Sequence, residues 1–217
     1  MSELFDEVDE EVRRDQLKKL WDQYSLYIIA GALLIIAGVG GWRGYQYLEA
    51  KKAAEAGIAF NKAAELSDQN KHAEAEAAFN DLAAKAPSGY RMLARVRAAA
   101  EAASRDPQAA VKLYDDMTAD RSIGAPEQDL ARVRAAGLLL ETTSYPNMLA
   151  RLEPATVPAA TFRHTARELL ALSAWRANDT AAARKWLDLI ANDGETPASL
   201  RSRAEALKEL LPPVAKS

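Results

Sequence analysis

Residues 93–99 read Leu-Ala-Arg-Val-Arg-Ala-Ala, and the same seven residues stand in the same order at positions 130–136, 37 residues later. A weaker third copy, Ala-Arg-Glu-Leu-Leu-Ala, occupies positions 166–171, about 35 residues after the second. An internal repeat of this length is typical of solenoids in which each repeat is a pair of helices. The duplication therefore predicts an all-helical stack of hairpins.

Each strong copy carries a stripe of apolar or small side chains at helical spacing. A helix with such a stripe needs a neighbour to cover it, so we expect each of these helices to pack against another. The stripe positions are Leu93, Val96, Ala100 and Ala103 in the first copy, and Leu130, Val133, Gly137 and Leu140 in the second.

A bulky side chain recurs between these helices at intervals of 35, 35 and 37 residues. One such residue in each repeat predicts a second helix that packs between hairpins. Two of these second helices have clear start signals, because Asp106 precedes Pro107 and Asp179 precedes an alanine run. The bulky residues are Phe79, Tyr114, Leu149 and Trp186.

The pattern weakens where prolines interrupt it. Pro146, Pro154 and Pro158 fall between Ser144 and Thr161, so we expect a shortened and irregular third hairpin there. The segment 197–211 is expected to cap the stack.

The stretch from Asn70 to Pro87 resembles the second helix of a tetratricopeptide repeat. Ala75, Phe79, Leu82 and Pro87 match the spacing of that helix. The small alanine admits the adjoining helix closely, the aromatic ring fills the space between hairpins, and the proline ends the helix. The chain is thus predicted to carry a tetratricopeptide-like solenoid.

Ahead of the repeats, residues 26–42 form a run of seventeen residues without a charge. A membrane-spanning helix needs about 20 mostly apolar residues, so this run is long enough if its ends are interfacial. Aromatic residues lie at both ends, as in the belts of membrane helices, and Arg43 can extend toward the headgroups. The expected interface residues are Trp21, Tyr24, Tyr27, Trp42, Arg43, Tyr45 and Tyr47.

Two other interpretations of this run are less consistent with the residues. A buried core helix would not be uniformly apolar between two aromatic belts. A cleaved signal peptide has a shorter apolar region, typically ~7–15 residues, without a long acidic segment before it. We therefore expect a single transmembrane helix at residues 25–47. Gly40 and Gly44 have a spacing that allows close helix packing, so a homo-oligomer is an open alternative.

Charge does not orient the span. Four basic residues precede it and four follow it, and orientation depends on the basic residues near the ends. The preceding ones are Arg13, Arg14, Lys18 and Lys19, and the following ones are Arg43, Lys51, Lys52 and Lys62.

Composition excludes several classes of function. Cysteine is absent, which removes disulfides, thiolate metal sites and a cysteine nucleophile. His72 and His164 have no second histidine at a ligand spacing, so we predict no metal site and no cofactor. Common catalytic and phosphate-binding motifs are missing, and basic residues do not cluster as nucleic-acid binding requires. A non-enzymatic protein that binds neither DNA nor RNA is expected.

Arg95 and Arg132 occupy the same position in the two copies of the motif. An arginine that faces the inner groove of a solenoid can form forked hydrogen bonds with a partner's carboxylate, so both are candidates for partner binding. The alternative is a solvated helix face, where arginine is common.

The segment before the span holds eight acidic and four basic residues within positions 1–25. Its apolar residues have helical spacing, which predicts an amphipathic helix that binds a partner or lies on the membrane surface. Those residues are Phe5, Val8, Val12, Leu17, Leu20, Trp21 and Tyr24.

Together with residues 7–13, Glu-Val-Asp-Glu-Glu-Val-Arg, and residues 20–24, Leu-Trp-Asp-Gln-Tyr, this arrangement resembles the YfgM family over nearly the whole chain. These are membrane-anchored tetratricopeptide proteins of Gram-negative bacteria described as ancillary subunits of the SecYEG translocon. The resemblance implies a cytoplasmic tail, an inner-membrane span and a periplasmic repeat domain that links the translocon to periplasmic chaperones. A scaffold of an envelope or division complex is the alternative.

The predicted organisation has four parts. These are an acidic amphipathic tail at 1–24, a transmembrane helix at 25–47, a tetratricopeptide-like domain at 48–211 and a C-terminal tail at 212–217.

Overall fold

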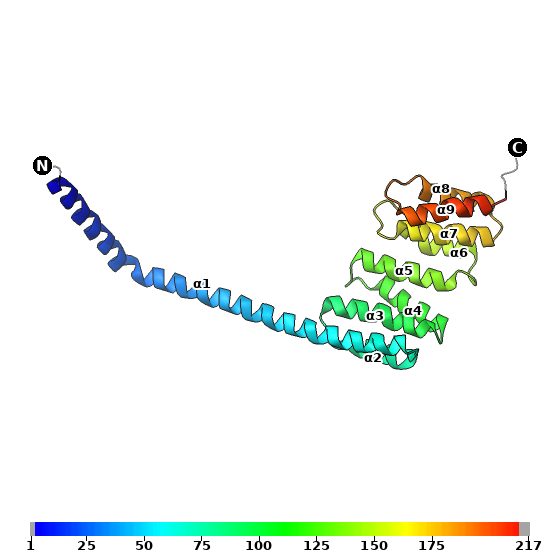
Figure 1. Ribbon diagram of the computed structural model, residues 1–217, viewed down its shortest axis with the longest axis horizontal. Coiled ribbons are helices and arrows are strands. Elements are labelled where there is room, and N and C mark those ends of the chain that lie inside the picture. The colour runs from blue at the N-terminus through cyan, green and yellow to red at the C-terminus, as the bar shows by residue number, and fades with distance from the viewer. Residues whose placement is uncertain (1–2, 213–217) are drawn as a thin grey trace. The chain divides into compact units, whose positions relative to one another are not determined.

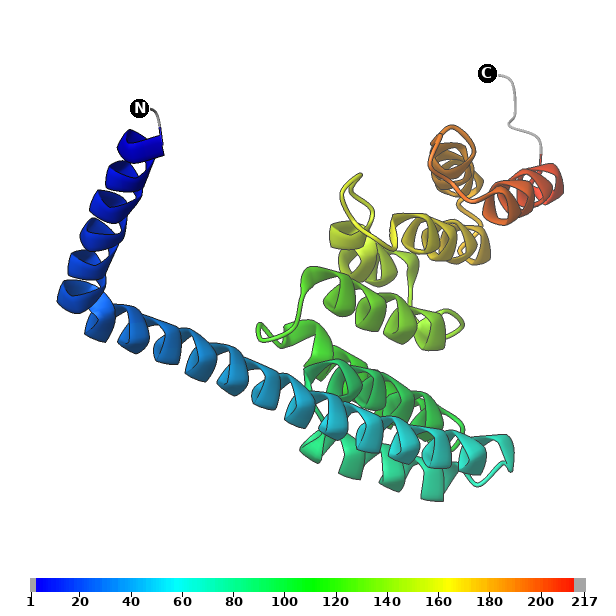
Figure 2. The same ribbon diagram turned by 60° about the vertical axis from the view of Figure 1, so that its left-hand side comes forward.

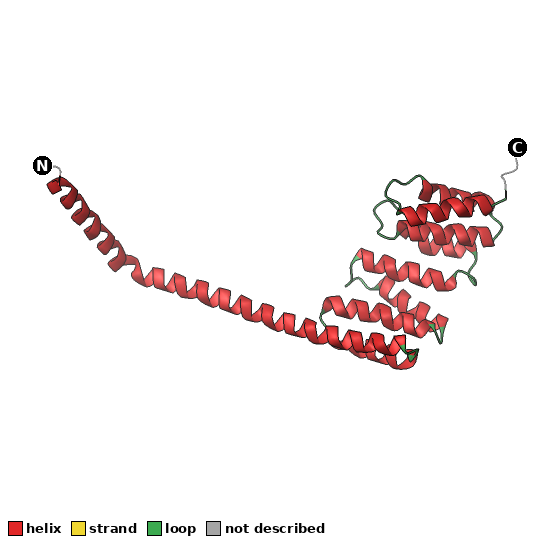
Figure 3. Cartoon of the chain, viewed as in Figure 1, coloured by secondary structure: helices red, strands yellow, loops and turns green. Residues whose placement is uncertain are grey.

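Helices make up the regular structure of residues 3–212, the part of the chain whose backbone the computed structural model describes (Figure 3). Side chains are described from Arg14 onward, apart from residues 15–17 and 20. No strand occurs in this range, so the predicted all-helical class is confirmed. The helices are α1 Glu3–Asp68, α2 His72–Lys85, α3 Ser88–Ala103, α4 Pro107–Ala119, α5 Ala125–Leu139, α6 Tyr145–Leu152, the short 3₁₀ helix η1 Glu153–Ala155, α7 Arg163–Arg176, α8 Thr180–Ala191 and α9 Ala198–Leu210 (Figure 1).

The chain divides into two compact units, Met1–Ala54 and Glu55–Ser217. The first unit is formed by α1, which continues into the second unit and ends at Asp68. The predicted tail at 1–24 and the predicted span at 25–47 both lie within α1. The side chains of Phe5, Val8, Val12, Leu17 and Leu20 lie outside the described residues, as do positions 213–217 of the C-terminal tail.

The second unit is a succession of helical hairpins. In Figure 2 they follow one another from α2 to α9, the red helix at the end of the series. Two of the turns inside hairpins close in the same way, because Asn70 and Asn178 adopt left-handed backbone angles, φ 60° and 61°. Asparagine tolerates this conformation better than most residues with a side chain. The backbone N–H of Asn70 donates to Ser67 and that of Asn178 donates to Trp175, both at 2.8 Å.

Capping side chains begin the second helices of two hairpins, as the sequence predicts. An Asp106 carboxylate oxygen accepts from the backbone N–H groups of Gln108 and Ala109, at 3.0 and 3.1 Å. The Asp179 carboxylate accepts from the N–H of Ala182 at 2.9 Å. These bonds satisfy donors that a helix N-terminus otherwise leaves unpaired.

Alanines fill the contacts between neighbouring helices. In α3 the inward positions are Ala94, Ala98 and Ala102, all at most 2% exposed, and in α5 the equivalents Ala131 and Ala135 are fully buried. A side chain of one methyl group allows two helix backbones to approach closely and still fill the interior. Three clusters of such buried residues hold successive hairpins together.

The prediction that the repeated stripe packs against a neighbouring helix is wrong for part of that stripe. Leu93 is 53% exposed and Gly137 is also exposed, whereas Val133 is buried. Val133 belongs to one buried cluster and Val96 packs against another, so these stripe residues do contact neighbouring helices. Leu93 and Gly137 are left on a face that no neighbouring helix covers.

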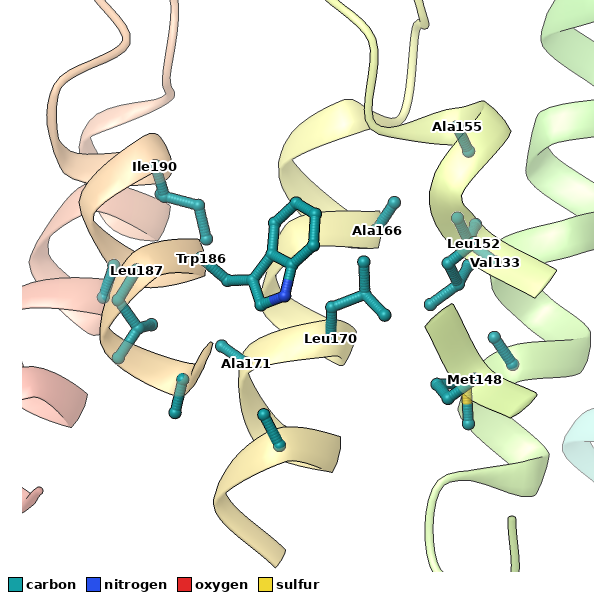
Figure 4. Packing of buried hydrophobic residues seen from close by; sticks show 14 of the residues in the cluster. Val133, Met148, Leu152, Ala155, Ala166, Leu170, Ala171, Trp186, Leu187 and Ile190 are labelled. Carbon is teal, nitrogen blue, oxygen red and sulfur yellow. The ribbon is translucent and has the colours of Figure 1, made fainter. Parts of the chain in front are cut away.

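The third hairpin is irregular, as the prolines predict. Its second helix, α6, has eight residues and leads directly into η1. Within α6 the fully buried residues are Met148 and Leu152, and Leu149 is only half-buried. Figure 4 shows Met148 and Leu152 on one side of Leu170, with Trp186 of α8 on the other.

Candidate partner-binding surface

The first unit presents an apolar surface without a protein partner among the described residues. Within Trp21–Asp68, a window of 18 residues has a mean hydropathy of 1.9 and no buried residue. α1 is therefore long and apolar enough to cross a membrane. Trp21 and Trp42 are 55% and 61% exposed, and the helix rises ~31 Å over the 21 residue steps from one to the other, close to the ~30 Å of a bilayer's hydrocarbon core.

The other residues predicted at the membrane interface are also exposed on this helix. Trp42 and Tyr45 lie together, with ring centroids 6.2 Å apart. The assignment of these side chains to an interface stays a prediction. The remaining ones are Tyr24, Tyr27, Arg43 and Tyr47.

In the repeats, the structure buries the side chains expected between hairpins, apart from the half-buried Leu149. Phe79 is fully buried, and its ring meets that of Phe60 edge to face with centroids 5.2 Å apart. Pro87 stands two residues beyond the end of α2 and precedes α3. The other buried members are Ala75, Leu82, Tyr114 and Trp186, 0%, 7%, 2% and 8% exposed.

Except for Leu140, the stripe residues of the repeats line two adjoining cavities of about 540 and 500 Å³. Both cavities are bounded by Leu130 of α5 and by Phe162 at the start of α7, so they form one continuous surface, called the inner groove below. Its other apolar lining residues include Met92, Leu93, Val96, Ala100 and Ala103 of α3, Val133, Gly137 and Leu138 of α5, and Leu169 of α7.

Both arginines predicted to contact a partner form ion pairs within the chain. Arg95 lies 2.6 Å from a carboxylate oxygen of Asp120, and Arg132 lies 2.5 Å from one of Asp129. The Ser122 hydroxyl and the Arg95 guanidinium lower the pKa of Asp120 to about 2, so this carboxylate stays charged at neutral pH. Partner binding by Arg95 and Arg132 stays a prediction, and these ion pairs would compete with it.

Each copy of the motif also contains a second arginine, for which the sequence pattern predicts no role. Arg97 lies over the Phe79 ring, with its guanidinium carbon 5.7 Å from the centroid. Arg134 is exposed, lines the larger cavity of the inner groove beside Tyr114, and forms no ion pair with the described residues. The duplication itself points to these residues, because each copy of the motif repeats two arginines. Phe162 had no such signal, since it lies outside the repeated motif.

Both histidines are hydrogen-bonded to residues of other segments of the chain. His72 approaches the buried carboxylate of Glu101 at 2.8 Å, and the Ser67 hydroxyl donates to the other oxygen of that carboxylate at 2.7 Å. Although burial raises the pKa of Glu101, these hydrogen bonds and the nearby charges bring it below its ordinary value. Glu101 therefore ties the turn between α1 and α2 to α3.

His164 belongs to a cluster that fixes the loop between α8 and α9. The Thr196 hydroxyl donates to the carbonyl of Ile190 at 2.7 Å, so its oxygen is left to accept from His164 Nδ1 at 3.1 Å. Burial and the charge of Arg163 lower the pKa of His164. Arg163 and Arg167 both donate to Asp193 at 3.0 Å. Each charged group of this cluster thus has a structural partner.

A cluster of three or more histidine, aspartate or glutamate side chains suited to a metal ion does not occur among the described residues. The inner groove carries Arg134, Glu127 and the phenol of Tyr114 among mostly apolar side chains. This lining suits binding of an apolar polypeptide surface better than acid–base chemistry.

Comparison with known proteins places this architecture in a family. No curated protein and no solved structure matches the chain. The tetratricopeptide repeat-like domain family matches residues 18–185, which is more than half of the chain and includes both the apolar part of α1 and the hairpins as far as α8. The chain therefore belongs to the tetratricopeptide repeat-like domain family.

Proposed function

We propose that the protein is a membrane-anchored, non-enzymatic interaction module that serves as an ancillary subunit of the SecYEG translocon and links it to periplasmic chaperones. The observation that carries the proposal is the extent of the family match, which begins at residue 18 and so includes both the apolar helix and the repeats. Repeat domains of this kind are interaction modules. The resemblance of the tail and repeats to the YfgM family supplies the specific partners.

The proposed mechanism is confinement without catalysis. A transmembrane helix at residues 25–47 would hold the repeats near the exit of the translocon and raise their effective concentration for chaperones or emerging chains. Each contact can then be weak. In this proposal the tail is cytoplasmic and the repeats are periplasmic.

Affinity purification of the full-length chain from its native membrane in mild detergent, followed by mass spectrometry, tests the partners. Recovery of translocon subunits together with chaperones supports the proposal. A variant without residues 1–24 should lose cytoplasmic-side contacts and keep folded repeats, because the hairpins pack among themselves.

The same experiment tests the alternative, a scaffold of an envelope or division complex. Gly40 and Gly44 favour it as far as it involves self-association, since a Cβ added at either position would meet no described atom within 4 Å beyond its chain neighbours and the nearby backbone of its own helix. Recovery of division or cell-wall proteins without the translocon would select the scaffold.

Orientation has its own test, because the chain contains no cysteine. Single-cysteine variants Ser2→Cys and Ser104→Cys, the latter at an exposed position, can be labelled in intact cells with a membrane-impermeant maleimide. Labelling at position 104 alone is expected. Labelling at position 2 alone would contradict the proposed topology.

A further inference from the structure

We propose that an open cavity on α8 binds a phosphate group, and that Arg184 and Lys185 hold this phosphate. The inference goes beyond the proposed interaction function, because the cavity shares no lining residue with the inner groove. The ligand is a phosphate ester, either a small soluble one or the headgroup of a phospholipid.

The cavity lies along the exposed side of α8 and has a volume of about 710 Å³. The opposite side of this helix is buried against its neighbours through Trp186, Leu187 and Ile190. Residues three or four positions apart share one side of a helix, which brings the lining residues of α8 together. They are Ala181, Arg184, Lys185, Asp188, Leu189 and Asn192, the last just beyond the end of the helix.

Part of the charge at this cavity is already compensated. Asp193, which lines the cavity together with Arg167 of α7, accepts hydrogen bonds from Arg163 and Arg167, both at 3.0 Å. Arg163 also forms an ion pair with Glu195. This cluster therefore combines two arginines with two carboxylates and has no net charge.

Two positive charges of the cavity remain without a carboxylate partner. Asp188, the other acidic residue of the lining, forms an ion pair with Lys208 of α9. Neither Arg184 nor Lys185 forms an ion pair with the described residues. A phosphate monoester carries about −1.5 to −2 charges at neutral pH, so it matches this surplus more closely than a single carboxylate does.

Arg184 is held in place and still has an unused donor. Its Nη2 donates to the backbone carbonyls of Leu211 and Pro212, at 3.0 and 2.8 Å, beyond the end of α9. Its Nη1 forms no hydrogen bond within the part of the chain that the structure describes. Lys185 is exposed, and its ammonium lies 5.7 Å from the centroid of the Trp186 ring. A guanidinium fixed by main-chain carbonyls loses less conformational freedom when it binds phosphate, so these contacts prepare the site.

The lining also accommodates the carbon skeleton of an ester. Ala181 and Leu189 line the same cavity, and Leu189 is 41% exposed. Covering an exposed leucine with a carbon chain is favourable, whereas inorganic phosphate would leave it in contact with water. A phosphate ester therefore fits the cavity better than the free ion does.

Isothermal titration calorimetry with the full-length chain in phosphatidylcholine nanodiscs tests the proposal. The soluble probe is glycerol phosphate. Glycerol is the control for the alcohol, and succinate is the control for an organic anion with two negative charges and no phosphate. Empty nanodiscs correct for adsorption to the lipid.

Wild-type protein should bind glycerol phosphate roughly tenfold more tightly than succinate, and glycerol should give no binding heat. Lys185→Gln should weaken glycerol phosphate binding roughly tenfold, and Lys185→Arg should retain most of it because the charge is kept. Arg184→Gln should weaken binding by at least as much as Lys185→Gln. Lys112→Gln, the same change at an exposed position of α4, should leave the affinity unchanged. Circular dichroism of each variant verifies that the helices are retained.

A second set of nanodiscs distinguishes the two sources of phosphate. Phosphatidate has a phosphomonoester headgroup, which would compete with glycerol phosphate if it occupied the cavity. Nanodiscs that contain oleate at the same charge control for general repulsion of the soluble anion. Weaker binding with phosphatidate than with oleate would assign the cavity to a lipid headgroup, and equal binding would assign it to a soluble phosphate ester.

Three results would overturn the inference. No binding of glycerol phosphate by the wild-type protein in phosphatidylcholine nanodiscs would remove the site. Unchanged affinity in both Lys185→Gln and Arg184→Gln would place the phosphate elsewhere on the chain. Succinate binding as tight as that of glycerol phosphate would assign the cavity to a carboxylate ligand. Because these variants leave the inner groove unaltered, their copurification with the translocon tests the proposed function separately.

Discussion

Replacing Phe79 with alanine should loosen the first two hairpins and leave the last ones intact. Phe79 is fully buried, meets Phe60 edge to face and lies under the guanidinium of Arg97. Truncating a buried phenylalanine to alanine typically costs about 3–5 kcal/mol, because apolar contact is lost and a cavity remains. The two ring contacts are part of that figure.

Hydrogen exchange followed by mass spectrometry measures the effect helix by helix. In a solenoid each repeat contacts its neighbours, so the free energy of local opening should fall for the end of α1, for α2 and for α3. Amides of α7 and α8 should keep their protection. Phe79→Leu is the matched control, since it retains most of the volume and should cost less than about 1.5 kcal/mol.

Two results would refute this reasoning. A loss below about 1 kcal/mol for Phe79→Ala would mean that the site collapses around the missing ring. An equal loss of protection in α7 and α8 would mean that the whole chain opens as one unit.

Three further predictions concern other parts of the chain. Because the folded state keeps the pKa of His164 below its unfolded value of about 6.5, stability should fall as pH drops from about 7.5 toward 5.5, and the melting temperature of His164→Gln should change less over that range. Asp106→Ala should cost about 1 kcal/mol in the opening of α4, measured by hydrogen exchange, whereas Asp106→Asn should cost much less. Leu34→Arg should cost about 3 kcal/mol of membrane insertion and raise the fraction extracted from membranes by carbonate, but Leu210→Arg should not.

The helical class and the order of the hairpins could be predicted from the sequence, because a repeat shows the same pattern of residues several times. The period of about 35 residues, the start signals at Asp106 and Asp179, and the proline-rich third hairpin all depend on local backbone preferences. Such local preferences predict the final structure when the packing of the helices favours the same conformation, as it does at these positions.

The groove was harder to predict from the sequence, because its position depends on which face of each helix the neighbouring helices leave uncovered. Leu93 and Ala94 are adjacent in sequence and both apolar, yet one is half-exposed and the other fully buried. Periodicity identifies a stripe without identifying what covers it. Similarly, Arg97 and Arg134 are equivalent residues of the two motif copies, yet Arg97 lies over the Phe79 ring and Arg134 lines the groove.

The links between hairpins bear on how the chain responds to a pulling force. Arg151 holds Asp115 and Arg203 holds Glu168, so each pair joins residues about one repeat apart. A pull on the C-terminal end would load one such link at a time and detach hairpins singly. Each hairpin of about 35 residues would release roughly 120 Å of extended chain at ~3.4 Å per residue, giving an evenly stepped extension in place of a single rupture.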